Sequence, residues 1–152
     1  MTIRTVRAIP YTTMKQFLND VDCMPLLEAE EHDKTYIVSI TNPEVMPLVR
    51  TNTETSIAFQ FDDDGISFTK EMAIEICQLV KKAMDDPADV YFLVNCQAGI
   101  SRSGAVSAFV QQLCVNYDDW IRKNRMVCPN YFVLDKLLSA WEELYGAPSP
   151  AR

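Results

Sequence analysis

Apolar and β-branched residues gather in four short runs, and each run predicts a β-strand. The runs are "TIRTVRAIPY" (2–11), "TYIVSI" (35–40), "SIAFQF" (56–61) and "DVYFLV" (89–94). The last run is almost unbroken, which is typical of a central strand in a parallel sheet that is covered on both faces. The sequence therefore predicts a sheet with the 89–94 strand in its interior.

Apolar residues at helical spacing predict three longer helices, within 67–86, 103–114 and 129–146. Ser67 or Thr69 can cap the first of them. The second is apolar on most sides, which favours a buried helix. Asn130 and Gly146 stand at the N-cap and beyond the last turn of the third.

Three further segments are shorter and less regular. The segment 12–21 predicts a short helix capped by Thr12 or Thr13, and 117–125 predicts another. The segment 22–34 is expected to be irregular, because it holds a proline and an acidic run.

Strands and helices alternate, so we predict a single domain over residues 1–152 with a three-layer αβα fold and a mainly parallel central sheet. The crossover from strand 56–61 to strand 89–94 makes the two strands run in the same direction. Their carboxyl ends then meet at one edge of the sheet, where open α/β folds bind ligands. The aspartates 62–64 and the loop that begins at Cys96 are therefore expected to be neighbours.

Composition and charge exclude several classes of function. The formal net charge of −7 argues against a nucleic-acid groove or an anionic membrane surface as partner. No apolar run is long enough to span a bilayer, and the first residues lack the apolar core of a signal peptide, so we expect a cytoplasmic protein. The five cysteines include no Cys-x-x-Cys pair, which predicts reduced thiols without a metal or another cofactor.

The segment "VNCQAGISRSGAV" (94–106) runs from a predicted strand into a predicted helix. It is not a Gly-x-Ser-x-Gly nucleophile elbow, because Ser103 stands at the final glycine. It also lacks the Gly-Lys-Ser/Thr of a Walker loop. A Cys–His protease pair is disfavoured, because the single histidine, His32, lies in the segment 22–34.

A phosphate-binding loop fits the same residues. Gly99 lets the loop curl so that successive backbone N–H groups point inward at the start of a helix. Arg102 adds a two-pronged guanidinium suited to phosphate oxygens. In that field the pKa of the Cys96 thiol is expected to lie well below its usual value, and Ser101 and Ser103 can supply hydroxyl hydrogen bonds. These residues predict a thiolate nucleophile in a phosphate cradle.

The stretch "NCQAGISRSG" (95–104) resembles the Cys-x-x-Gly-x-Ser-Arg-Ser signature of the cysteine-dependent protein tyrosine and dual-specificity phosphatases. The resemblance is greatest to their compact branch, which includes small bacterial and viral members. It covers about 56–145, where "RMVCPNYFVLDKLLSAWEE" is similar to the closing Arg…Pro-Asn helix of that branch. It implies a phosphatase fold and hydrolysis of phosphate monoesters on proteins or small molecules.

The resemblance also implies a role for each residue of the loop. Cys96 attacks phosphorus and forms a phosphocysteine, while Arg102 and the backbone amides of 97–102 bind the phosphoryl oxygens. An aspartic acid protonates the leaving oxygen and then activates water, and Ser103 stabilises the departing thiolate. The implied substrate-binding positions are Gln97, Ala98, Gly99, Ile100, Ser101 and Arg102.

Three aspartates are candidates for the general acid. Asp63 is the first choice, because its spacing to Phe68 matches the spacing in the resembled family. Spacing to the cysteine favours Asp64 instead, and Asp62 is a third candidate. Alternatively, these carboxylates merely form a solvated turn with Gly65.

Asn95 stands where the resembled phosphatases usually have histidine, which organises the loop and lowers the pKa of the thiol. We therefore expect an active but slower enzyme, with a phosphoryl-binding module that lacks turnover as the alternative. Sulfur transfer and arsenate reduction match less well, because the former usually lacks an upstream acid and the latter needs a resolving cysteine near the first. The loop carries no cation besides Arg102, which favours phosphotyrosine, or phosphoserine and phosphothreonine, over an inositol phosphate.

Overall fold

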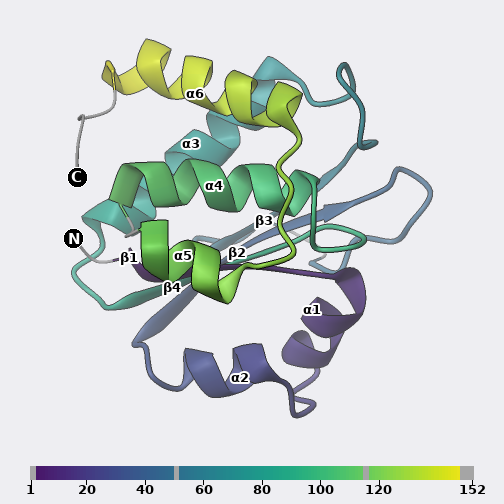
Figure 1. Ribbon diagram of the computed structural model, residues 1–152, viewed down its shortest axis with the longest axis vertical. Coiled ribbons are helices and arrows are strands. Elements are labelled where there is room, and N and C mark those ends of the chain that lie inside the picture. Colours follow the sequence, from purple (N-terminus) through teal and green to yellow (C-terminus); the bar gives the residue numbers. More distant parts are fainter. Residues whose placement is uncertain (1–2, 50–51, 115–116, 148–152) are drawn as a thin grey trace.

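The computed structural model describes residues 3–49, 52–114 and 117–147, and Figure 1 shows the arrangement of their elements. The strands are β1 (Ile3–Ile9), β2 (Lys34–Thr41), β3 (Ser56–Gln60) and β4 (Val90–Asn95). The helices are α1 (Tyr11–Leu18), α2 (Met24–Ala29), α3 (Lys70–Asp85), α4 (Arg102–Cys114), α5 (Tyr117–Lys123) and α6 (Tyr131–Tyr145). Each strand that the sequence predicts is confirmed.

The strands form one sheet in the order β1-β4-β2-β3, and every neighbouring pair is parallel. The interior position predicted for 89–94 is confirmed, because β4 pairs with β1 on one side and with β2 on the other. Parallel pairing brings all the carboxyl ends to one edge of the sheet. The loops that follow β3 and β4 therefore open on the same side, as expected, and the loop after β2 opens there too.

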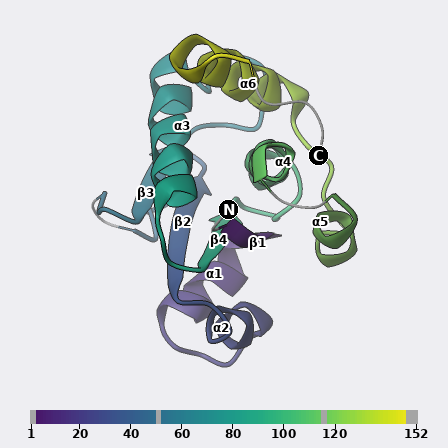
Figure 2. The ribbon, with the colours of Figure 1, turned by 90° about the vertical axis from the view of Figure 1, so that its left-hand side faces the viewer.

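Helices cover both faces of the sheet, which confirms the three-layer αβα architecture. Figure 2 shows α3, α4 and α6 on one face, α1 and α2 on the other, and α5 beside β1. Side chains of β4 alternate between two buried clusters: Phe92 and Val94 face the larger helical layer, and Tyr91 and Leu93 face the smaller one. Burial on both faces is the physical reason for the unbroken apolar run in this strand.

Two helices begin at caps that the sequence predicts, and in both the cap bonds to N–H groups two or three residues farther along the chain. The side chain of Thr69 accepts from the backbone N–H of Met72 at the start of α3. The side chain of Asn130 accepts from the N–H groups of Phe132 and Val133 at the start of α6. Of the two residues proposed for α3, Thr69 is therefore the cap.

Two predictions in the first third of the chain are wrong. Helix α1 begins at Tyr11, with Pro10 as its N-cap, so Thr12 and Thr13 lie inside the helix and do not cap it. The segment expected to be irregular contains α2, with Pro25 in its first turn. Proline favours that position because its missing N–H would have no partner there, and six residues are too few to show helical periodicity.

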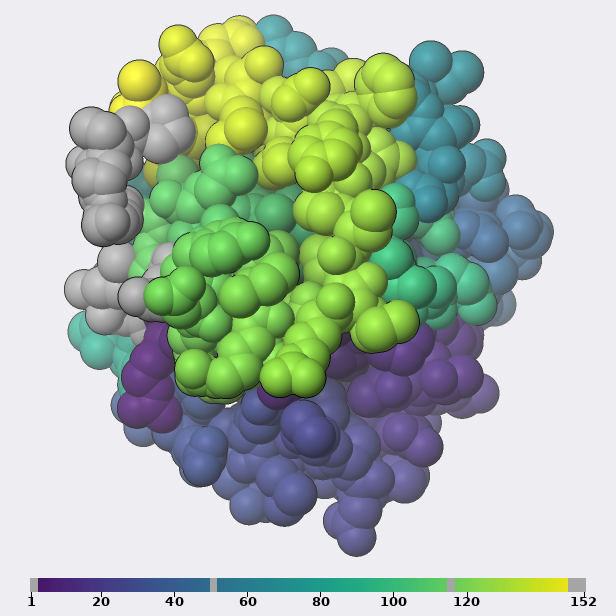
Figure 3. Space-filling view, viewed as in Figure 1, coloured from purple at the N-terminus to yellow at the C-terminus, as the bar shows by residue number. Residues whose placement is uncertain are grey.

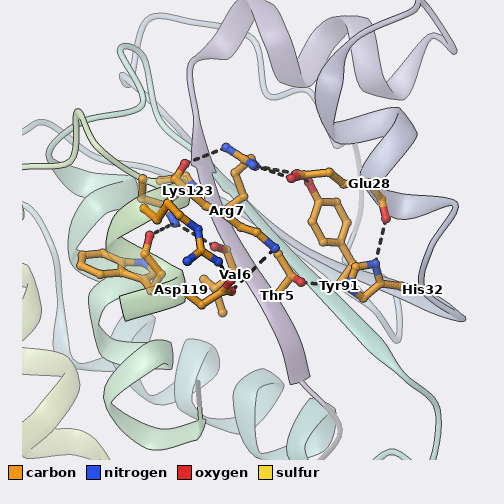
Figure 4. Close-up of polar contacts among 12 residues, drawn as sticks. Thr5, Val6, Arg7, Glu28, His32, Tyr91, Asp119 and Lys123 are labelled. Atoms are coloured by element: carbon orange, nitrogen blue, oxygen red, sulfur yellow. Dashed lines mark hydrogen bonds and ion pairs between the residues drawn. The ribbon is translucent and has the colours of Figure 1, made fainter. Parts of the chain in front are cut away.

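The free edge of β1 is covered by side chains from other elements (Figure 4). Asn124, just after α5, accepts from the N–H of Ala8 at 2.8 Å and donates to the carbonyl of Val6 at 3.0 Å, as a neighbouring strand would. Arg7 pairs with Glu28 of α2 and donates to the carbonyl of Lys123 at 2.7 Å. These contacts protect the edge strand and fix where α5 ends.

Candidate active site

The loop between β4 and α4 (96–101, hereafter the cysteine loop) curls against the end of β1. Gly99 has φ +75°, and a Cβ there would lie 2.5 Å from the carbonyl carbon of Ile9 and from the nitrogen of Pro10. The backbone N–H of Tyr11 donates to the carbonyl of Gln97 at 3.1 Å. A glycine is therefore required for both the turn and the close approach, as the sequence indicates.

A second segment, 124–130, crosses the cysteine loop on its other side and is hereafter called the overlying segment. The N–H of Cys128 donates to the carbonyl of Ile100 at 2.9 Å, and the N–H of Asn130 donates to the carbonyl of Ser101 at 3.0 Å. At Gly104, on the first turn of α4, a Cβ would lie 2.8 Å from the Val127 side chain. The loop is thus held between two backbones, and its carbonyls point outward toward them.

Cys96 lies inside this loop at the end of the central strand, and the residue is 2% exposed. Burial raises the pKa of the Cys96 thiol, but hydrogen bonds outweigh burial and hold that pKa below its ordinary value. The donors are the Ser103 hydroxyl, 3.1 Å from the sulfur, and the backbone N–H groups of Ser103, Gly99 and Ile100. Of the amides of 97–102 that the sequence predicts to face inward, those of Gly99 and Ile100 point at the sulfur, together with that of Ser103.

Arg102 lies beside the same loop, and the residue is 5% exposed. One of its terminal nitrogens donates to the carbonyl of Phe61, at the end of β3, at 2.5 Å. The Nε is buried and has no hydrogen-bond partner within the described part of the chain. A buried cationic donor without a partner costs stability unless something else binds there, so this nitrogen is available to an anion.

The acidic loop (61–68) lies next to the cysteine loop, as expected from the parallel sheet. Oδ1 of Asp63 accepts from the Ser101 hydroxyl at 3.0 Å and from the Asn130 side-chain amide at 2.7 Å. Asp63 is exposed, so solvent and ligands can reach it. Among the three candidate aspartates, Asp63 makes side-chain contacts with the cysteine loop and the overlying segment.

Asp64 has a different role. It accepts from the N–H groups of Ile66 and Ser67 and from the Ser67 hydroxyl, at 3.0, 2.7 and 2.6 Å. The Ser67 hydroxyl, then the two backbone N–H groups, hold the pKa of Asp64 below its ordinary value. A carboxylate stabilised as an anion by its own turn is a poor proton donor. Asp62 is exposed, and its carbonyl accepts from the Asp64 N–H.

The remaining predicted residues occupy the positions that the sequence suggests. Gln97 and Ala98 are exposed at the tip of the cysteine loop. Asn95 is fully buried, and its amide donates to the carbonyl of Cys96 at 3.2 Å. Its side-chain oxygen is buried without a partner in the described chain.

The single histidine lies away from this site, against Tyr91 on the face of the sheet that α1 and α2 cover. Its Nδ1 is 2.8 Å from the Glu28 carbonyl and its Nε2 is 3.0 Å from the Thr5 hydroxyl (Figure 4). Within residues 3–49, 52–114 and 117–147, no group of three or more His, Cys, Asp or Glu residues is placed to hold a metal ion. None of the helices in those ranges has the length and hydropathy of a membrane span.

Sequence reasoning missed two contacts that hold the site together. It placed Asn130 at a helix cap but did not reveal its contact with Asp63, and it gave no role to Asn124. Each contact joins residues far apart in the chain: Asn130 and Asp63 are separated by 67 positions, and Asn124 and Ala8 by 116. The Pro-Asn pair before α6 was the one available signal, since it belongs to the resembled closing helix.

Comparison with known proteins supports the fold. No family model matches the chain, and no curated protein matches it. Among solved structures, it is similar to the human tyrosine phosphatase-like serine/threonine/tyrosine-interacting protein, with a TM-score of 0.51 and 19% identity over 82% of this chain and 85% of that one. Human DUSP28 gives a TM-score of 0.51 and 16% identity over 78% and 84%.

OH1 from the Orf virus, a tyrosine phosphatase, matches with a TM-score of 0.44 and 13% identity over 94% of this chain and 73% of that one. The two structures with higher scores show that the chain has a phosphatase-like fold, as the resemblance implies.

Proposed function

We propose that the protein is a cysteine-dependent phosphatase that hydrolyses phosphate monoesters, with phosphotyrosine as the first candidate and phosphoserine or phosphothreonine as further ones. One observation carries the proposal: backbone N–H groups and the Ser103 hydroxyl converge on the Cys96 sulfur. Nitrogen donors that stabilise a thiolate can equally bind the equatorial oxygens of a phosphoryl group. The unpartnered Nε of Arg102 supplies a further donor beside them.

The first step transfers the phosphoryl group to sulfur. The Cys96 thiolate attacks phosphorus, an S–P bond forms, and the P–O bond to the leaving group breaks. Asp63, protonated at the start of this step, gives its proton to the leaving oxygen. Arg102 and the loop amides stabilise the charge on the three remaining oxygens.

The second step hydrolyses the phosphocysteine. Asp63, now a carboxylate, removes a proton from water, and the water oxygen attacks phosphorus as the S–P bond breaks. The electron pair of that bond returns to sulfur, where the Ser103 hydroxyl stabilises the thiolate. Inorganic phosphate leaves, and the enzyme returns to its starting charge state.

The contacts of the acidic loop favour Asp63 over its neighbours as the general acid. Asp63 shares a hydrogen bond with Ser101 of the cysteine loop, so its carboxyl group is held beside the leaving group of a bound phosphate ester. Asp64 is turned into its own loop by Ser67 and Ile66. The hydrogen bonds from Ser67 and Ile66 lower the pKa of Asp64 and so disfavour the protonated form that a general acid needs.

Asn95 keeps a second function open, a module that binds phosphorylated ligands without turning them over. The deciding experiment measures turnover of an aryl phosphate by the wild type, Cys96→Ser, and Asn variants of Asp62, Asp63 and Asp64. We expect no turnover for Cys96→Ser, and for Asp63→Asn a loss in kcat on the order of 10²–10⁴. Asp62→Asn stays near the wild type.

A matched control is Cys128→Ser. Cys128 is an exposed cysteine next to the same loop, but its contact with Ile100 uses the backbone N–H, which serine keeps. This variant should therefore retain activity. A wild type that binds phosphopeptide but shows no turnover would establish the binding module instead.

A further inference from the structure

A hollow of about 370 Å³ adjoins the cysteine loop, between the acidic loop and the start of α6. Its lining includes Asp63, Asp64, Ser101, Asn130, Tyr131 and Phe132, and it is hereafter called the flank hollow. Figure 3 shows the start of α6, in yellow-green, beside the teal segment that follows β3. Because Ser101 belongs to both the hollow and the cysteine loop, a residue next to a bound phosphorylated side chain can reach the hollow.

Two exposed aromatic rings form one wall of the flank hollow. Tyr131 and Phe132 are each 65% exposed and are the first two residues of α6. The Phe132 ring lies against Gly65, where a Cβ would be 3.3 Å from it. Neighbouring exposed aromatic rings at the mouth of a site are typical of a recognition surface.

The flank hollow is also negatively charged. Asp63 and Asp64 line the hollow, and no Lys or Arg is among its described lining residues. The nearby Lys136 is not among the lining residues: its ammonium group donates to the Phe68 carbonyl at 2.6 Å, although its charge contributes a little to the lowered pKa of Asp64. A carboxylate next to the phosphorylated residue would meet like charge in this hollow, and a basic side chain there would meet opposite charge.

Exposed aromatic rings together with negative charge match one kind of side chain. We propose that the flank hollow binds the arginine or lysine that neighbours the phosphorylated residue of a protein substrate. The planar guanidinium of arginine can stack on the rings of Tyr131 and Phe132 while it faces the exposed Asp63. This proposal rests on the proposed function and narrows its substrates to phosphorylated residues next to a basic side chain.

The test compares phosphotyrosine peptides that differ at the positions flanking the phosphotyrosine, with Arg, Leu or Glu placed on either side. We expect kcat/KM for the Arg peptide to exceed that for the Leu peptide by roughly fivefold to thirtyfold, with the Glu peptide lowest. This preference should shrink as salt is added, because the hollow is open to solvent. Equal values for the three peptides, or a preference for Glu, overturn the proposal.

The decisive variant is Tyr131→Leu, which removes an aromatic face and is expected to bring the Arg-to-Leu ratio below about twofold. The matched control is Tyr117→Leu, because Tyr117 is likewise an exposed tyrosine at the first position of a helix, α5. The control should keep the full ratio. A ratio that survives Tyr131→Leu shows that the hollow does not select the basic residue.

The same peptides also separate this proposal from the phosphatase proposal. Their dissociation constants for Cys96→Ser report binding without turnover. If the wild type has no activity but Cys96→Ser still prefers the Arg peptide, the proposed binding of a basic residue in the flank hollow is supported and the phosphatase proposal is wrong. If turnover occurs without any preference in kcat/KM or in binding, the proposed role of the flank hollow is wrong and the phosphatase proposal is supported.

Discussion

The side chain of Asn130 caps α6 with its oxygen and donates from its nitrogen to Oδ1 of Asp63 at 2.7 Å. The same nitrogen also lies 3.1 Å from the carbonyl of Asp64. One amide therefore links the helix start to the acidic loop. The oxygen stabilises the start of α6, and the nitrogen positions the proposed general acid. A substitution that changes only the nitrogen can therefore test the second role without removing the first.

Asn130→Asp keeps the capping oxygen but replaces the donor with a carboxylate that repels Asp63. Aspartate and asparagine are comparable N-caps, so we expect the free energy of unfolding in urea to change by less than about 1 kcal/mol. Turnover of an aryl phosphate should fall roughly tenfold, which corresponds to the loss of one hydrogen bond that positions a reacting group. Thr69→Asp, at the cap of α3, is the control and should retain activity.

The contact between Asn130 and Asp63 also shows where sequence analysis stops. The cap itself was predictable, because its donors lie two and three residues farther along the chain. The loop chemistry of Cys96, Ser103 and Arg102 was predictable for the same reason, since it depends on a strand, a turn and a helix that are consecutive. For the general acid the two spacings disagree, since the spacing to Phe68 favours Asp63 and the spacing to the cysteine favours Asp64. The contacts of Asp63 with Ser101 and Asn130, which favour it, run across the fold and are not encoded in spacing.

Long-range contacts likewise explain what the sequence missed in the fold. In the sequence Asn124 is simply a polar residue after a short helix. Its hydrogen bonds with Val6 and Ala8 could not be predicted without knowing that β1 lies at the edge of the sheet. Helix α2 is too short for periodicity, and its link to the sheet is the side chain of Glu28, which pairs with Arg7 and accepts from the Tyr91 hydroxyl. By contrast, the position of β4 was predictable, because a strand that is buried on both faces consists almost entirely of apolar residues.

The hydrogen bond from the Ser103 hydroxyl to the Cys96 sulfur predicts a change in thiol reactivity. Burial raises the pKa of Cys96, and the Ser103 hydroxyl is the first of the groups that lower it. In Ser103→Ala the pKa should rise, so alkylation by iodoacetamide at pH 7 should slow by roughly tenfold. Plots of alkylation rate against pH should move to higher pH than in the wild type.

Ser107→Ala is the matched control for that experiment. Ser107 is also buried in α4, but its hydroxyl donates to the carbonyl of Gly104 at 3.1 Å. Its removal should leave the rate of Cys96 alkylation unchanged. Equal slowing in both variants would show a general disturbance of α4, and no slowing in Ser103→Ala would contradict the role of its hydroxyl.

Two glycines with positive φ give a test of the loop geometry. Gly99 and Gly146 have φ +75° and +85°, but a Cβ would meet backbone atoms at 2.5 Å in the first and nothing within 4 Å in the second. Gly146→Ala should therefore lower the free energy of unfolding by about 1 kcal/mol and leave activity intact. Gly99→Ala should abolish aryl phosphate turnover, because the cysteine loop cannot close against Ile9 and Pro10. Turnover by Gly99→Ala at the wild-type rate would contradict this geometry.

The pair of Arg7 and Glu28 predicts how stability depends on pH. Their side chains are 14% and 16% exposed. Burial raises the pKa of Glu28, but the hydrogen bonds from Arg7 and Tyr91 outweigh it and hold that pKa below its ordinary value. A carboxyl with a lowered pKa in the folded state contributes stability above its unfolded pKa of about 4.3, and that contribution is lost as the pH falls through the folded value.

Arg7→Met removes the cation and leaves Glu28 buried, so at pH 7 the free energy of unfolding should fall by about 3 kcal/mol. At pH 3 the loss should be smaller, because Glu28 is then largely protonated in the variant. Arg7→Met combined with Glu28→Gln should recover most of the stability, since glutamine is neutral and still accepts from the Tyr91 hydroxyl. Arg122→Met, which breaks the exposed pair with Asp119, should cost less than about 1 kcal/mol. An Arg7→Met loss of equal size at both pH values would mean that packing of the arginine, and not its charge, holds α2 and α5 to the edge strand.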